Sequence, residues 1–166
     1  MATRATSPQD RVERMSAMQK GAGLVGAVFL LVGILGFIPG ITTNFGDITF
    51  ATEDSEAELL GLFQVNILHN IVHLAFGVVG IWAAMRTWDV ARTYLLVGGL
   101  VYLALWLYGL VVDLDSDANF AAFNTADNWL HFGLGVGMIG LGTLLSGERD
   151  CVAKRTSVMK PAAVKL

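Results

Sequence analysis

One stretch of the chain decides its fold class. Residues 93–112 read TYLLVGGLVYLALWLYGLVV, twenty consecutive residues without a charge, between Arg92 and Asp113. A helix needs about 20 apolar residues to cross the roughly 30 Å hydrocarbon core of a bilayer. Because lipid cannot satisfy backbone polar groups, a helix is the form in which such a segment spans. The stretch therefore predicts a transmembrane helix with a basic residue at one end and an acidic residue at the other.

Similar apolar stretches lie on both sides of this one. The four predicted spans cover about 21–38, 59–84, 91–112 and 123–146. The composition agrees, because 54% of the residues are apolar and only 15% are charged, as in membrane proteins. We therefore predict an all-α membrane protein, a four-helix transmembrane bundle over residues 21–146. A cytoplasmic arm (1–20) precedes the bundle and a basic cytoplasmic tail (147–166) follows it.

The charged residues are sorted between alternate connections. All eleven Lys and Arg lie before the first span, between the second and third, or after the fourth: Arg4, Arg11, Arg14, Lys20, Arg86, Arg92, Arg149, Lys154, Arg155, Lys160 and Lys165. The other two connections hold nine acids: Asp47, Glu53, Asp54, Glu56, Glu58, Asp113, Asp115, Asp117 and Asp127. Short cytoplasmic loops retain Lys and Arg, so both termini are expected in the cytoplasm. The lipid bilayer is the expected partner, and nothing points to nucleic acid.

The second and fourth spans repeat one polar pattern. They read Asn66-x-x-His69-Asn70-x-x-His73-Leu-x-x-Gly77-Val78 and Asn124-x-x-Asp127-Asn128-x-x-His131-Phe-x-x-Gly135-Val136. A weaker echo joins Leu24-Val-Gly26-Ala to Leu96-Val-Gly98-Gly in the first and third spans. Two tandem helical hairpins in the same orientation explain both matches, related by an axis along the membrane normal. The pair Gly133 and Gly137 predicts close helix packing in the fourth span.

The repeated pattern places polar side chains inside the predicted membrane. His69 and His73 share one helix face, and Asp127 and His131 share the matching face of the fourth span. Their neighbours in the pattern are Asn66, Asn70, Asn124 and Asn128. At about 1.5 Å per residue, His73 lies about 16 Å from the cytoplasmic end of its span. Because polar side chains are expensive against lipid, the set is expected to face the bundle interior or a cavity.

Several functions fit such a set. Three imidazoles and a carboxylate suit a divalent transition metal, with the asparagines holding the ring nitrogens. His73 and His131 could instead be axial ligands of haem b, or the four ionisable residues could relay protons. The structural interpretation is that the side chains hydrogen-bond across helices and fix their pairing. We adopt this last interpretation and keep the others as alternatives.

An acidic turn in the second external connection suggests a weak external cation site. Its alternation, Asp113-x-Asp115-x-Asp117-x-Asn119, matches the first half of an EF-hand loop. However, Ala118 replaces the required Gly and Asn124 replaces the final Glu, so the calcium pattern is broken. The chain has no recognisable catalytic motif, so we do not expect an enzyme. Assembly into a homo-oligomer or a larger membrane complex is left open.

Four segments resemble a known family. Residues 65–74 (VNILHNIVHL), 91–96 (ARTYLL), 105–109 (LWLYG) and 124–131 (NTADNWLH) are similar to an actinobacterial family of four-span membrane proteins. That family is known only as a domain of unknown function. The resemblance covers about residues 17–146, and the two His-containing motifs are its specific part. It implies a multi-pass protein of the bacterial plasma membrane and transfers no activity.

Overall fold

The computed structural model describes residues 15–147, so the predictions for most of the arm and for the tail lie outside the described residues. The elements follow in the order α2 (Ala17–Leu35), β1 (Thr42–Thr43), the 3-10 helix η1 (Phe45–Asp47), β2 (Glu58–Leu59), β3 (Phe63–Gln64), α3 (Ile67–Ala84), α4 (Trp88–Val111) and α5 (Thr125–Leu144). The three short strands form one antiparallel sheet in the order β1-β2-β3.

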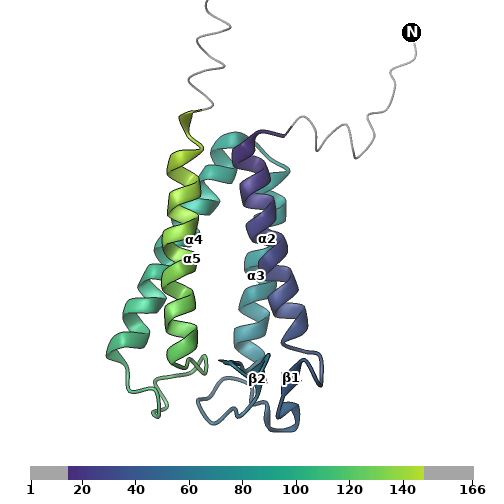
Figure 1. Ribbon diagram of the computed structural model, residues 1–166, viewed down its shortest axis with the longest axis vertical. Helices are drawn as coiled ribbons and strands as arrows, with labels where there is room; N and C mark the ends of the chain where they lie inside the picture. The colour runs from purple at the N-terminus through teal and green to yellow at the C-terminus, as the bar shows by residue number, and fades with distance from the viewer. Residues whose placement is uncertain (1–14, 148–166) are drawn as a thin grey trace, which may run out of the picture.

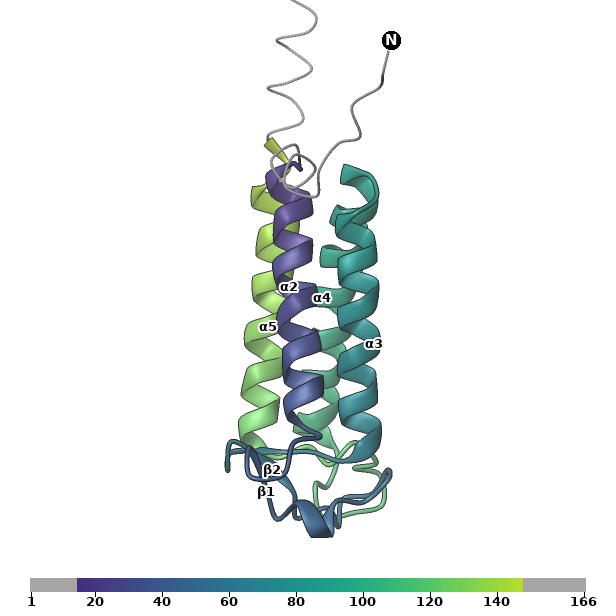
Figure 2. The same ribbon diagram turned by 90° about the vertical axis from the view of Figure 1, so that its right-hand side faces the viewer.

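The α-helices of this region form two pairs that stand side by side. Helix α2 packs mainly on α3, and α4 packs mainly on α5. The start of α2, the α3–α4 turn and the end of α5 lie at one end, while the strands and the loop 112–124 lie at the other (Figure 1). Figure 2 shows the helices running along one long axis with these loops gathered below them. The fold is therefore two helical hairpins whose loops share one end.

Helix caps explain where the helices begin. The Ser16 hydroxyl accepts a hydrogen bond from the Gln19 N–H at 3.2 Å, and the Gln19 side chain accepts one from the Ser16 N–H at 3.1 Å. This reciprocal capping box starts α2. The Thr87 hydroxyl accepts a bond from the Val90 N–H at 3.4 Å and starts α4. Such caps satisfy amide groups that have no partner within the helix.

The predicted second span, 59–84, begins too early. The structure starts α3 at Ile67 and places residues 59–66 in the small sheet and its turn. Leu60 and Gly61 have φ angles of 57° and 64°, which an α-helix excludes. Asn66 then caps the helix. An apolar run continues through this boundary, so hydropathy alone hides the turn. The other three helices lie within four residues of their predicted bounds.

Glycines on facing surfaces let the helices of each pair approach closely. A Cβ at Gly26 would stand 2.7 Å from the Ile81 backbone nitrogen, and one at Gly99 would stand 3.1 Å from that of Ile139. Gly133 and Gly137 have no such role, because an added Cβ would meet no atom within 4 Å. The expectation that this pair packs against a helix of the same bundle is therefore wrong for the described residues. The pair faces outward.

Three of the described helices are long and apolar enough to cross a membrane, namely α2, α3 and α4. Helix α5 has comparable length but carries Asp127, Asn128 and His131 in its first two turns, which lowers its mean hydropathy. The large outward side chains Leu24 and Val78 are 66% and 60% exposed. Exposed apolar residues of this size suit a lipid-facing surface.

Candidate functional site

The eight residues of the repeated pattern gather at the loop end of the bundle, and we call them the polar cluster. They are Asn66, His69, Asn70 and His73 at the start of α3, and Asn124, Asp127, Asn128 and His131 at the start of α5. All are buried except Asn124, which is partly buried. Since α3 starts at Ile67, both histidines of this helix lie in its first two turns, nearer the loops than the opposite end.

The two cap asparagines each bind the loop of the other hairpin. The Asn66 side chain accepts a bond from the His69 N–H at 2.9 Å and donates to the Phe120 carbonyl at 2.8 Å. The Asn124 side chain accepts a bond from the Asp127 N–H at 3.0 Å and donates at 2.9 Å to the carbonyl of Leu62. Each cap thus starts its own helix and ties that helix to the opposite loop.

His69 and Asp127 occupy matching positions and also reach across to the opposite hairpin. The His69 Nδ1–H donates to the Ala121 carbonyl at 2.9 Å. The Asp127 carboxylate accepts a bond from the Asn124 N–H at 3.1 Å and lies near the backbone N–H of Gln64 in the opposite loop. An imidazole N–H donates a hydrogen bond to a carbonyl, whereas a carboxylate accepts one from an N–H. The residue types at this position therefore match the backbone groups that they meet.

Asn70 and Asn128 hold the two helices of each hairpin together. The Asn70 amide donates to the Gly36 carbonyl at 2.9 Å, and the Asn128 amide donates to the Gly109 carbonyl at 2.8 Å. A Cβ at either glycine would overlap the facing asparagine side chain. The two glycines were not among the residues predicted for the site. The sequence signal that could have identified them is a glycine near the loop end of both the first and the third predicted span.

The three histidines converge beside Tyr102. The rings of His69 and His73 stack with centroids 4.6 Å apart, and the ring of His131 is 6.2 Å from that of His69. The Tyr102 ring lies 5.4 Å from His131 and 6.5 Å from His73. Tyr102, only 1% exposed, was absent from the predicted site, because an isolated tyrosine in an apolar helix gives no pattern.

A small cavity lies among these rings. Its volume is about 110 Å³, and its lining includes the three histidines, Tyr102 and Phe123. The His73 Nδ1–H donates to the His69 carbonyl at 3.1 Å. Within residues 15–147, the buried His131 Nδ1 has no hydrogen-bond partner. Asp127 does not line the cavity, so the predicted set of three imidazoles and a carboxylate is only partly brought together.

As the side chains stand, no group of three or more His, Cys, Asp or Glu residues in the described region is placed to hold a metal ion. The stacked rings of His69 and His73, 9° from parallel, lie face to face instead of pointing at one centre. The cavity is also far smaller than the 300–1,000 Å³ that pockets for cofactor-sized molecules occupy. The present arrangement therefore has no room for haem b between His73 and His131.

The acidic turn of the second loop is solvated. Asp113, Asp115 and Asp117 are all exposed. The Asp113 carboxylate accepts a bond from the Asp115 N–H at 3.1 Å, as in an ordinary turn. Nothing in this geometry strengthens the prediction of a weak cation site.

Three apolar helices of spanning length, outward apolar side chains and a buried polar cluster define a helical membrane protein. The chain belongs to the family described as a domain of unknown function, DUF4383, whose sequence profile matches residues 19–144. The resemblance to a family known only as a domain of unknown function is thereby confirmed. No curated protein and no solved structure matches the chain significantly.

Proposed function

We propose that this chain is a four-span plasma-membrane protein with a structural or accessory role, in which the polar cluster locks two helical hairpins together. Both termini are then cytoplasmic and both loops of the cluster end lie outside. The sorted charges support this orientation. In this proposal α5 is the fourth span. Asp127, Asn128 and His131 in its first two turns are buried, so these polar side chains do not face lipid.

The reciprocal bonding of the two loops carries the proposal. Asn66 and His69 donate to carbonyls of the second loop, and Asn124 donates to a carbonyl of the first. Each bond joins one hairpin to the other, so none can form until the hairpins are together. A polar group buried without a partner costs about 1–3 kcal/mol. Incorrect pairing of the hairpins would leave several such groups unsatisfied at once.

Matched contacts support the proposed tandem origin of the hairpins. Asn70 meets Gly36 as Asn128 meets Gly109. Likewise, Gly26 lies against the backbone of Ile81 as Gly99 lies against that of Ile139. These contacts pair Gly26 with Gly99, one residue further along than the Gly98 suggested by the sequence echo. A duplication in the register set by the contacts would explain why the polar pattern occurs twice.

The cross-loop donors can be removed while the helix caps stay. Asn66→Asp and Asn124→Asp keep the oxygen that caps the helix but lose the NH₂ that reaches the opposite loop. In Asn66 this NH₂ also donates to the Thr52 carbonyl of its own loop at 3.3 Å, so Asn124→Asp is the cleaner variant. Each should lower the free energy of unfolding in detergent by about 1–3 kcal/mol. Thr43→Ala is the control, because the Thr43 hydroxyl donates to the Glu58 carbonyl of the same loop. Wild-type stability in both Asp variants would disprove the lock.

Reporter fusions test the span count and orientation. A periplasm-active reporter after Asn44 or Asp117 should be active, and one after Thr87 should be inactive. A fusion at the C-terminus tests α5 directly, since four spans return the chain to the cytoplasm. An active periplasmic reporter at that end, with the other fusions behaving as expected, would show that α5 does not cross.

A metal site is the second candidate, and one observation favours it. His69 and His73 each use Nδ1–H on a backbone carbonyl, which leaves the lone pair on Nε2. Metal-binding histidines are commonly oriented in this way, although here the rings would have to turn to share an ion. Metal analysis of purified protein tests the idea. Stoichiometric zinc or copper that is lost in His73→Ala/His131→Ala would support it, and a metal-free wild type after supplementation would refute it.

A further inference from the structure

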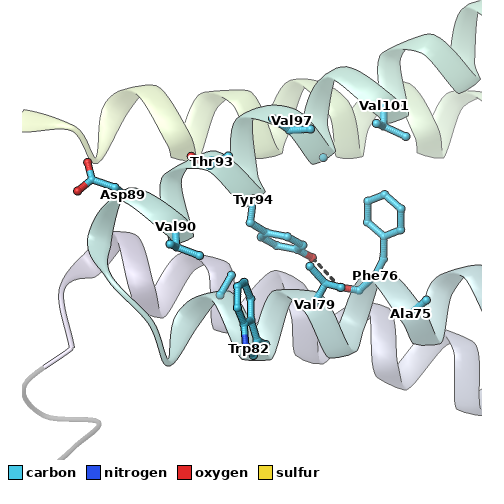
Figure 3. Close-up of a pocket in the computed structure, with 12 residues that line it drawn as sticks. Ala75, Phe76, Val79, Trp82, Asp89, Val90, Thr93, Tyr94, Val97 and Val101 are labelled. Carbon is cyan, nitrogen blue, oxygen red and sulfur yellow. Dashed lines mark hydrogen bonds between the residues drawn. The ribbon is translucent and has the colours of Figure 1, made fainter.

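A groove opens between α3 and α4 beside the turn that connects them (Figure 3). Its volume is about 560 Å³, within the range of pockets that bind small molecules. The two walls are mainly apolar and come from different helices: Phe76, Val79 and Trp82 on α3, and Val90, Val97 and Val101 on α4. The groove lies on the opposite half of the bundle from the polar cluster, so it belongs to a different site.

The packing of the helices explains why the groove stays open. Helices α3 and α4 follow one another through a short turn, yet they contact each other far less than the helices within each hairpin. Tyr94 spans the gap, since its hydroxyl donates to the Phe76 carbonyl at 3.2 Å. Its ring lies against Gly80, where a Cβ would stand 2.6 Å from the tyrosine oxygen. The Tyr94 side chain thus forms the floor of the groove. The space between α3 and α4 outside this side chain is not filled by the described residues.

The groove faces the surroundings of the bundle. Val79 and Val97, from opposite walls, are 50% and 54% exposed. Both helices belong to the set that is long and apolar enough to cross a membrane. A groove between two membrane-spanning helices opens to lipid hydrocarbon instead of water. An acyl chain that lies in it gains van der Waals contacts with both helices.

The end of the groove beside the turn is polar, with Asp89 in its lining and a cation near Trp82. The Arg86 guanidinium lies 5.0 Å from the ring centroid of Trp82, which lines the groove. Asp89 lies at the same end, so the two charged side chains mark where the apolar wall stops. Arg86 is exposed, and a guanidinium suits a phosphate with its planar pair of N–H donors. An apolar trough with an arginine near one end matches the layout of a phospholipid.

We propose that the groove binds one acyl chain of a membrane phospholipid whose phosphate is held by Arg86. The lipid belongs to the leaflet on the side of the α3–α4 turn. The site requires only that α3 and α4 lie in the bilayer, so it does not depend on the lock between the hairpins. A second copy of the chain could also cover an apolar groove, and the experiment distinguishes that occupant.

Native mass spectrometry of the full chain in mild detergent, with added palmitoyl-oleoyl phosphatidylglycerol, tests the site. The wild type should retain one lipid per protein. Val97→Phe and Ala75→Phe narrow the groove from α4 and α3, and each should reduce retention about tenfold or more. Arg86→Gln should reduce it severalfold. Val136→Phe is the matched control, because this valine on α5 is 49% exposed and outside the groove.

The two narrowing variants come from different helices, so misfolding of one leaves the other as a test. Thermal unfolding identifies which variants are folded. Equal lipid retention by the wild type, the folded narrowing variants and Val136→Phe would overturn the proposal. So would a lipid-free wild-type dimer that Val97→Phe converts to a monomer, since the groove would then be an interface between copies.

Discussion

Replacing Gly109 with alanine should destabilise the protein, although alanine is the better helix former. A Cβ there would stand 2.6 Å from the Asn128 Cγ and 2.8 Å from its Nδ2, and closer still to Oδ1. The asparagine must therefore move, and its 2.8 Å bond to the Gly109 carbonyl is lost. Asn128 is only 5% exposed, so its displaced amide has no ready access to solvent.

The expected magnitude combines three effects. Leaving a buried polar group unsatisfied costs about 1–3 kcal/mol, and overpacking costs about 1–3 kcal/mol more. The higher helix propensity of alanine offsets about 1 kcal/mol of this. Gly109→Ala should therefore lower the free energy of unfolding by about 1–5 kcal/mol. Gly133→Ala is the matched control, since the added methyl group meets no atom within 4 Å and only the propensity gain remains.

Reversible unfolding in mixed detergent micelles, followed by circular dichroism, measures both variants. A double-mutant cycle with Asn128→Ala then isolates the contact. If the clash causes the loss, Gly109→Ala should cost much less in the Asn128→Ala background than in the wild type. The reasoning is refuted if Gly109→Ala is as stable as Gly133→Ala, or if its cost is the same in both backgrounds.

The same assay checks two further predictions. His131→Phe should change the free energy of unfolding by less than about 1 kcal/mol, because the His131 Nδ1 that it removes has no partner in the described region. His69→Phe should lower the free energy of unfolding by about 1–3 kcal/mol, since it removes a cross-loop donor. Equal losses in the two variants would contradict this assignment. Asp127→Ala removes the capping box and should cost about 1–2 kcal/mol, whereas Thr125→Ala, at an exposed position two residues earlier, should not. An Asp127→Ala variant as stable as the wild type would show that the capping box does not stabilise the start of α5.

The sequence predicted the helices better than their contacts. Hydropathy located α2, α4 and α5 within four residues of their bounds, because a run of apolar residues is a local property of the chain. It extended the second span over residues 59–66, where left-handed backbone at Leu60 and Gly61 forms a turn. Local conformation decided that boundary, and an average of hydrophobicity over a window does not detect it.

Seven of the eight residues of the repeated pattern are buried and Asn124 is partly buried, but the pattern did not indicate their partners. Most of the bonds of the polar cluster end on backbone carbonyl or N–H groups, as those of Asn66, His69 and Asn70 do. Every residue carries such groups, so no side-chain pattern reveals which one is used. The role of Gly36 and Gly109 as partners was missed for the same reason.

The sequence by itself determined the family, the apolar character of the helices, the approximate bounds of three of them and the polar pattern shared by α3 and α5. Each of these depends on composition or on spacing along the chain, and both are local properties. Only the tertiary structure decided that the caps cross to the opposite loops, that Asp127 lies outside the cavity of the histidines, and that Gly133 and Gly137 face outward. Those outcomes depend on how the two hairpins meet, because the bonding groups are more than 50 residues apart in the chain.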